Sequence, residues 1–161
     1  FANFVRRKKR GLIHKNLEFM KCLVVDDDVL SVKAVEVCIS KTPFLSLAGS
    51  CFNAKDAIEF IRQNPVDLIF LDVEMPGTNG FEMLEQLKSV PQIILVTGKP
   101  EYAVEAFDYD VTDFLVKPFD FDRFTKAANR AKAYMSWLRT SKQMKVKQMN
   151  FSLRKIQSSL S

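Results

Sequence analysis

The chain has 161 residues, 47% of them hydrophobic, and a net charge of +5, which allows one domain with a full core and terminal extensions. Its apolar runs are shorter than the ~20 residues of a membrane span, and no apolar segment follows the basic start to form a secretory signal. The three cysteines lack a Cys-x-x-Cys pair, which favours reduced thiols in the cytoplasm over a zinc site. The single histidine, His14, lies in the basic start, which argues against a catalytic histidine.

The charge is unevenly distributed along the chain. Residues 20–133 hold 12 Lys and Arg against 18 Asp and Glu, a net charge of −6, whereas both ends are basic. An acidic body argues against nucleic-acid binding through that body. Because Met20 directly precedes the first apolar run, we interpret 1–19 as a basic leader or expression-derived segment. Residues 20–133 then form the domain, and 134–161 form a helical extension or linker.

Strand and helix patterns alternate five times along residues 20–133. The predicted strands cover 21–26, 45–51, 67–72, 92–97 and 113–117. The predicted helices lie near 29–41, 54–64, 79–88 and 101–108, and a last helix begins near Asp120. Continuous apolar runs are typical of parallel strands that are covered on both faces. The alternation therefore predicts an α/β fold, a five-stranded parallel sheet with helices on both faces.

The tail after Ala133 also looks helical, because its apolar residues fall near helical spacing, which is broken only around Lys142. These apolar residues are Met135, Leu138, Val146, Met149, Leu153, Ile156 and Leu160. The tail is interpreted as a packed extension, a linker to a further domain, or a helix that pairs in a dimer. A basic amphipathic helix that touches DNA or an anionic membrane ranks below these alternatives.

Four predicted strands end on a polar residue: Asp26, Asp72, Thr97 and Lys117. The carboxyl ends of parallel strands share one edge of the sheet, where open α/β folds place their functional crevice. One aspartate of the run 26–28 suffices to cap the next helix, so the run exceeds what capping requires. Crowded carboxylates repel one another, and Mg²⁺ prefers such oxygen ligands.

Lys117 precedes Pro118, which makes this bond a candidate cis peptide that aims the lysine at the acidic residues. A carboxylate nucleophile, a metal, a cation and the Thr97 hydroxyl together suit phosphoryl transfer. The sequence has no Gly-x-x-x-x-Gly-Lys loop for nucleotide hydrolysis and no Ser–His pair for acyl transfer.

Over about residues 20–133 the chain resembles the receiver domain of two-component response regulators. The motifs that carry this resemblance are Val24-Val25-Asp26-Asp27-Asp28, Leu71-Asp72-Val73-Glu74-Met75-Pro76-Gly77, Thr97-Gly98 and Lys117-Pro118-Phe119. The resemblance implies a flavodoxin-like (CheY-like) sheet with strand order 2-1-3-4-5, followed here by a C-terminal helical extension. It also implies a switch that is phosphorylated by a sensor histidine kinase and is no enzyme beyond self-phosphotransfer and autodephosphorylation.

By the same resemblance, Asp72 is the phosphoacceptor. Asp26, Asp27 and Asp72 hold Mg²⁺ together with the backbone carbonyl of Glu74.

The competing class is an aspartyl-phosphatase enzyme. Such enzymes normally carry a cap insertion, and the motif spacing leaves no room for one.

Two further residues are assigned to the phosphoryl group by resemblance. Thr97 supplies a hydroxyl and Lys117 a cation. Phe114 occupies the position of an aromatic switch, although plain core packing also explains a phenylalanine there. Phosphorylation would then shift an existing equilibrium of the fourth helix, fifth strand and fifth helix.

The segments 101–107 and 113–118 resemble the LytR/AlgR (LytTR) subgroup, whose receivers usually precede a DNA-binding domain. Residues 134–161 are too short for that domain, so DNA contact is expected only through a domain outside this chain. The expected output is transcription in the full-length protein. The alternative is a stand-alone or degenerate receiver that binds proteins. A homodimer is expected, either through the face formed by the fourth helix, fifth strand and fifth helix or through the C-terminal helix. The remaining expectations are no membrane contact and a cytoplasmic location.

Overall fold

The computed structural model describes residues 19–160, so the leader 1–19 lies outside the described residues except for its last residue. Five parallel strands form one sheet in the order β2-β1-β3-β4-β5, which confirms the order implied by the resemblance. The strands are β1 (Met20–Val25), β2 (Leu45–Cys51), β3 (Leu68–Leu71), β4 (Gln92–Thr97) and β5 (Asp113–Val116).

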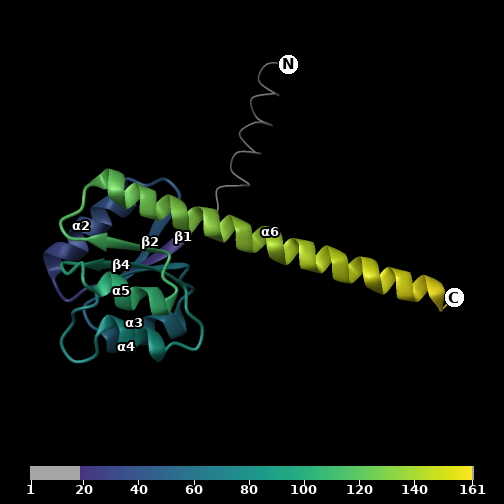
Figure 1. The fold of residues 1–161 in the computed structure, drawn as a ribbon, viewed down its shortest axis with the longest axis horizontal. Helices are drawn as coiled ribbons and strands as arrows, with labels where there is room; N and C mark the ends of the chain where they lie inside the picture. Colours follow the sequence, from purple (N-terminus) through teal and green to yellow (C-terminus); the bar gives the residue numbers. More distant parts are fainter. Residues whose placement is uncertain (1–18, 161) are drawn as a thin grey trace, which may run out of the picture.

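Helices cover both faces of this sheet (Figure 1). On one face lie α2 (Val29–Ser40) and the first half of α6 (Phe121–Ser159). On the other face lie α3 (Ala54–Gln63), α4 (Gly80–Glu85) and α5 (Tyr102–Ala106), followed by a 3-10 turn at Phe107–Tyr109. The two-sided cover explains the continuous apolar runs of the inner strands β3 and β4, whose side chains are buried on both faces.

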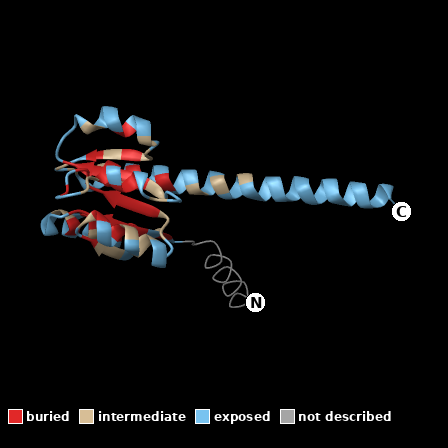
Figure 2. Ribbon diagram, turned by 90° about the horizontal axis from the view of Figure 1, so that it is seen from below, coloured by how far each residue is buried: buried red, intermediate tan, exposed pale blue. Residues whose placement is uncertain are grey.

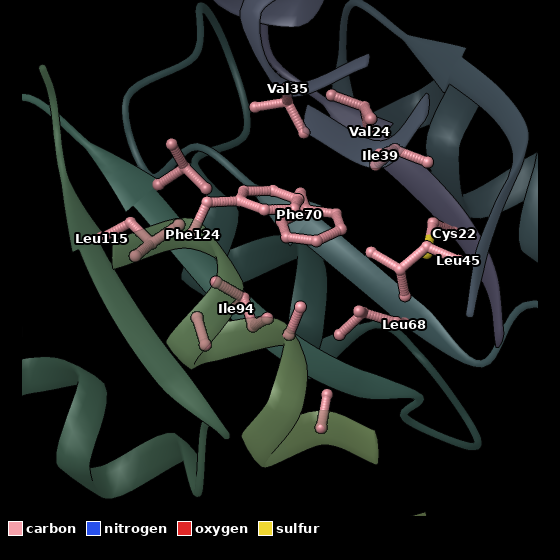
Figure 3. Close-up of a cluster of buried hydrophobic side chains, with 14 of the residues drawn as sticks. Cys22, Val24, Val35, Ile39, Leu45, Leu68, Phe70, Ile94, Leu115 and Phe124 are labelled. Atoms are coloured by element: carbon pink, nitrogen blue, oxygen red, sulfur yellow. The ribbon is translucent and has the colours of Figure 1, made fainter. Parts of the chain in front are cut away.

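Each face has its own hydrophobic core. Along β1, Cys22 and Val24 point into the core under α2 and α6, whereas Leu23 and Val25 point into the other core. In the first core Phe70 stacks on Phe124 with ring centroids 5.1 Å apart (Figure 3). The buried sheet and the exposed outer helix faces are seen in Figure 2. These cores hold the strand ends, and hence the residues that follow them, in fixed positions.

Two helices differ from the sequence expectation. Helix α4 is shorter than the predicted 79–88, and the predicted helix 101–108 is split into α5 and the 3-10 turn. Helix α6 runs without interruption to Ser159, so the last helix and the helical tail of the sequence prediction form one helix. No glycine or proline occurs between 121 and 159, and lysine is a good helix former, which accounts for the continuity. Among residues 19–160, no helix is both long and apolar enough to cross a bilayer.

Candidate functional site

Three carboxylates meet at the carboxyl ends of β1 and β3. These strands are neighbours, with Val25 opposite Leu71, so Asp26 and Asp72 emerge side by side. Ligand oxygens of Asp26, Asp27 and Asp72 lie within 4.8 Å of one another. Asp26 and Asp72 are buried, with 3% and 6% exposure, while Asp27 faces solvent. The convergence expected from the strand ends is therefore present.

Lys117 reaches this cluster from the end of β5. Its Nζ lies 2.6 Å from Oδ2 of Asp26 and 3.8 Å from Oδ2 of Asp72. The Lys117–Pro118 bond is cis, as the sequence suggested. The backbone N–H of Lys117 donates to the carbonyl of Thr97 at 2.8 Å, which fixes the start of the side chain next to β4. One ammonium group thus faces three carboxylates.

The pKa of Asp72 is raised in this environment. Burial raises this pKa from 3.8 to about 6; Lys117 opposes the rise, and the neighbouring Asp26 and Asp27 add to it. The N–H of Glu74 donates to Oδ1 of Asp72 at 3.3 Å and lowers the pKa slightly. A divalent cation relieves such repulsion, and a set of hard carboxylate oxygens fits Mg²⁺.

Thr97 and Phe114 lie on the adjacent strands β4 and β5. Thr97 is fully buried, and its hydroxyl oxygen accepts a hydrogen bond from the N–H of Lys99 at 3.3 Å. Phe114 is half-buried against the core of the α3, α4 and α5 face, and it pairs in register with Leu95, two residues before Thr97. Both residues therefore sit close to the edge that carries the acidic cluster.

Asp28, the third residue of the acidic run, has a structural task. Its Oδ1 accepts the N–H of Leu30 at 3.1 Å, and its Oδ2 accepts the hydroxyl of Ser31 at 2.9 Å. It is the N-cap of α2, a position that favours aspartate. The sequence indicated one cap among the three aspartates but did not tell which one.

An ion pair across the mouth of the site was missed by the sequence reasoning. Glu74 lies 2.6 Å from Nζ of Lys99, and the Tyr102 hydroxyl donates to Glu74 at 3.2 Å. These contacts join the loop after β3 to the segment after β4. The available signal was a pair of opposite charges, each two residues after a strand-end residue, Asp72 or Thr97.

A second missed feature is the glycine that opens α4. A Cβ on Gly80 would lie 2.5 Å from the backbone carbonyl oxygen of Asp72 and 3.1 Å from Cα of Val73. Only glycine permits this approach, and the N–H of Gly80 donates to the Val73 carbonyl at 2.9 Å. Helix α4 is thereby held directly against the backbone of Asp72.

Comparison with known proteins identifies the family that this chain resembles. The family model described as the response regulator receiver domain matches residues 22–129. Curated relatives include the sensory transduction protein LytT of Bacillus anthracis, 33% identical over 70% of this chain and 47% of the relative. The transcriptional regulatory protein LytR of Staphylococcus aureus is 32% identical over 71% of this chain and 48% of the relative. The chain thus spans about half the length of these relatives, both of which support the LytR/AlgR subgroup.

Solved structures show the same fold. The response regulatory domain of mrkE from Klebsiella pneumoniae superposes with a TM-score of 0.68 at 27% identity, over 73% of this chain and 99% of that domain. TrrA of Thermotoga maritima, solved in complex with Mg²⁺ and BeF, has a TM-score of 0.63 at 24% identity over 70% of this chain and 99% of TrrA.

Proposed function

This chain belongs to the response regulator receiver domain family of two-component systems, and we propose that Asp72 is its phosphoacceptor. The observation that carries the proposal is the position of Asp72. It is a buried carboxylate that lies 3.8 Å from the ammonium group of Lys117 and within the acidic cluster at the sheet edge. The proposed donor is the phosphohistidine of a sensor histidine kinase.

The proposed metal site consists of carboxylate oxygens of Asp26, Asp27 and Asp72, with the backbone carbonyl of Glu74 as a further ligand. The three carboxylates and the raised pKa of Asp72 support a divalent cation here. When bound, Mg²⁺ supplies positive charge that offsets the carboxylates and the oxygens of the phosphoryl group. The Mg²⁺-bound neighbour TrrA is consistent with this choice of metal.

In the proposed transfer, a carboxylate oxygen of Asp72 attacks phosphorus. A P–O bond forms while the P–N bond to the kinase histidine breaks, and its electron pair returns to the imidazole nitrogen. Lys117 stabilises negative charge on the phosphoryl oxygens, and the Thr97 hydroxyl donates to one of them. The 3.8 Å between Lys117 and Asp72 supports the role of the lysine, because a small movement brings it into contact.

The proposed switch couples Thr97 to Phe114. Movement of the Thr97 hydroxyl toward the phosphoryl group vacates space beside β5, into which the half-buried Phe114 ring turns. The adjoining face of α5, β5 and α6 exposes two large apolar residues, Val104 and Phe107, with 82% and 88% exposure. These residues form an apolar surface to which a partner protein can bind, and the switch can change the conformation of this surface.

The proposed output is transcription, which rests on the name of the LytR relative and on the shared receiver half. DNA contact is assigned to a domain outside these 161 residues, and the location to the cytoplasm. A stand-alone receiver whose output is protein binding is the alternative. Beyond self-phosphotransfer and autodephosphorylation, no enzymatic turnover is proposed.

Phosphate uptake tests this function. The chain is incubated with Mg²⁺ and a small phosphodonor, and the intact mass is measured; one phosphoryl group is expected in the parent and none in Asp72→Asn. Asp67→Asn is a matched control, because Asp67 precedes the same strand at its opposite end. Uptake by Asp72→Asn equal to the parent refutes the site. Turnover of a small phosphoester supports the phosphatase class instead, and failure to bind millimolar Mg²⁺ supports a degenerate receiver.

A further inference from the structure

Helix α6 continues far beyond the domain to which its first half belongs (Figure 1). Its buried residues Phe124, Ala127, Ala128 and Ala131 all precede residue 132, whereas residues 142–160 are exposed throughout. At 1.5 Å per residue, the part from 134 to 159 is about 39 Å long. Helices in proteins gain most of their stability from packing of an apolar face, so a projecting helix of this length calls for a partner.

The projecting part carries an apolar seam that one lysine interrupts, and we define the seam as Met135, Leu138, Lys142, Val146, Met149, Leu153, Ile156 and Leu160. Successive members are 3, 4, 4, 3, 4, 3 and 4 residues apart, a heptad pattern with one four-residue insertion. The first member, Met135, packs against the core under α2 and α6. The last five are at least half exposed, between 51% and 84%. The seam therefore extends a buried face into solvent.

The charges on the projecting part indicate what covers the seam. Residues 134–161 contain six Lys and Arg and no acidic residue. Lys147, Arg154 and Lys155 lie on the side of the helix away from the seam, Arg139 and Lys145 flank it near the domain, and Lys142 lies within it. After Val146 the flanking residues are uncharged: Asn150, Ser152, Gln157 and Ser159. This uncharged stretch can therefore lie beside Arg139, Lys142 and Lys145 of a second copy without opposing like charges.

A groove lies where the seam leaves the domain. It has a volume of about 870 Å³, and Met135, Leu138 and Lys142 form its helix side. The domain side is apolar and acidic, with Leu84, Val90 and Val111 beside Asp67, Glu85 and Asp110. Arg130 also lines it, paired with Asp113 at 3.1 Å. Such a groove suits a helix end that is apolar on one side and basic on the other.

We propose that two copies of this chain pair antiparallel through the seam, with the C-terminal end of each α6 seated in the groove of the other. Read in opposite directions, the seam is nearly self-complementary: Met135 meets Leu160, Lys142 meets Leu153, and Val146 meets Met149. The antiparallel pairing brings Arg154 and Lys155 to the acidic groove. A parallel pairing instead stacks Lys142 on its own copy and carries Arg154 and Lys155 away from the acidic groove.

This assembly goes beyond phosphoryl transfer and does not depend on Asp72. The first test compares two apolar residues of the projecting helix, Leu153 in the seam and Phe151 on the opposite side, which are 56% and 70% exposed. By sedimentation of the full chain, the parent is expected to be a dimer. Leu153→Glu is expected to raise the dimer dissociation constant by at least about 30-fold, and Phe151→Glu by less than about 3-fold. Equal effects of the two substitutions, or a monomeric parent, overturn the proposal.

A second test fixes the direction of pairing by disulfide cross-linking. The double variant Lys142→Cys with Leu153→Cys is expected to cross-link readily, and each single variant is not, because identical residues then lie about 16 Å apart, beyond disulfide reach. The parent chain controls for its own Cys22, Cys38 and Cys51, of which the first and last are buried. Cross-linking of the single variants shows parallel pairing and refutes the antiparallel arrangement. A parent monomer that binds anionic vesicles or DNA shows another occupant and refutes the self-pairing.

Discussion

The ammonium group of Lys117 forms its short ion pair with Asp26, at 2.6 Å, and not with Asp72, which lies 3.8 Å away. Both carboxylates are buried, and Lys117 itself retains 24% of its side-chain exposure. The lysine is therefore held by one of the proposed metal ligands in this state of the protein. Any cation that enters the cluster competes with it for Asp26.

From this competition we expect Lys117→Met to bind Mg²⁺ more tightly than the parent, by about 3- to 10-fold. The methionine keeps the length of the side chain and removes its charge. Calorimetric titration with Mg²⁺ measures the effect. Lys99→Met is the matched control, because Lys99 pairs with Glu74 on the rim and is expected to change the affinity less. Weaker Mg²⁺ binding in Lys117→Met contradicts the competition.

The neighbouring residues Asp27 and Asp28 are expected to behave differently toward Mg²⁺. Asp27 belongs to the acidic cluster, whereas Asp28 caps α2. Asp27→Asn should lower the Mg²⁺ affinity by about tenfold or more, since it removes a charged ligand. Asp28→Asn should leave the affinity within about 2-fold and keep the cap, because asparagine caps helices as well as aspartate. The shift of the melting temperature with Mg²⁺ concentration reports both, and equal losses argue against the assignment of Asp27.

The raised pKa of Asp72 predicts that the metal-free protein becomes less stable as the pH rises. Burial, reinforced by Asp26 and Asp27, raises this pKa from 3.8 to about 6, so the folded state binds more protons than the unfolded state between these values. The free energy of unfolding therefore falls as the pH rises through this window. Asp72→Asn is expected to add about 1–2 kcal/mol of stability near pH 8 and almost none near pH 4. Urea unfolding in a chelator measures this, and a pH-independent gain refutes the electrostatic origin.

A second buried carboxylate stabilises the domain instead. Burial alone would raise the pKa of Asp113, but hydrogen bonds from Arg123 at 2.7 and 3.0 Å and from the N–H of Phe114 hold it below its usual value. This contribution is present at neutral pH and is lost as the pH falls through the lowered pKa.

Arg123→Gln is accordingly expected to cost about 2–3 kcal/mol at neutral pH, because it leaves a buried carboxylate with fewer partners. Arg62→Gln breaks the exposed pair with Glu59 and should cost less than about 0.5 kcal/mol. Urea unfolding at neutral and acidic pH compares the two variants. A loss at Arg123 that is as small as at Arg62, or that grows toward acidic pH, contradicts this account.

The features that could be predicted from sequence are those that depend on apolar runs and on strand ends. The runs that end at Asp26, Asp72, Thr97 and Lys117 became neighbouring strands, because a parallel sheet covered on both faces needs such runs. The convergence of the polar residues followed from topology alone. The cis bond before Pro118 was suggested by residue type.

Features that depend on side-chain direction and length were not predictable. The choice of Asp28 as the helix cap, the pairing of Glu74 with Lys99, and the preference of Lys117 for Asp26 are each decided by distances of a few ångströms. The role of Gly80 likewise became visible only from its approach to the backbone of Asp72.

The central claim is that one phosphoryl group becomes bound to Asp72. Its most direct test is to phosphorylate the chain with Mg²⁺ and a small phosphodonor, reduce the acyl phosphate with borohydride, and locate the product by tandem mass spectrometry. Reduction converts a phosphorylated aspartate to homoserine, so the account predicts homoserine at position 72 and unmodified aspartate at positions 26 and 27. Homoserine at Asp26 or Asp27, or its formation in an Asp72→Asn chain, would contradict the account.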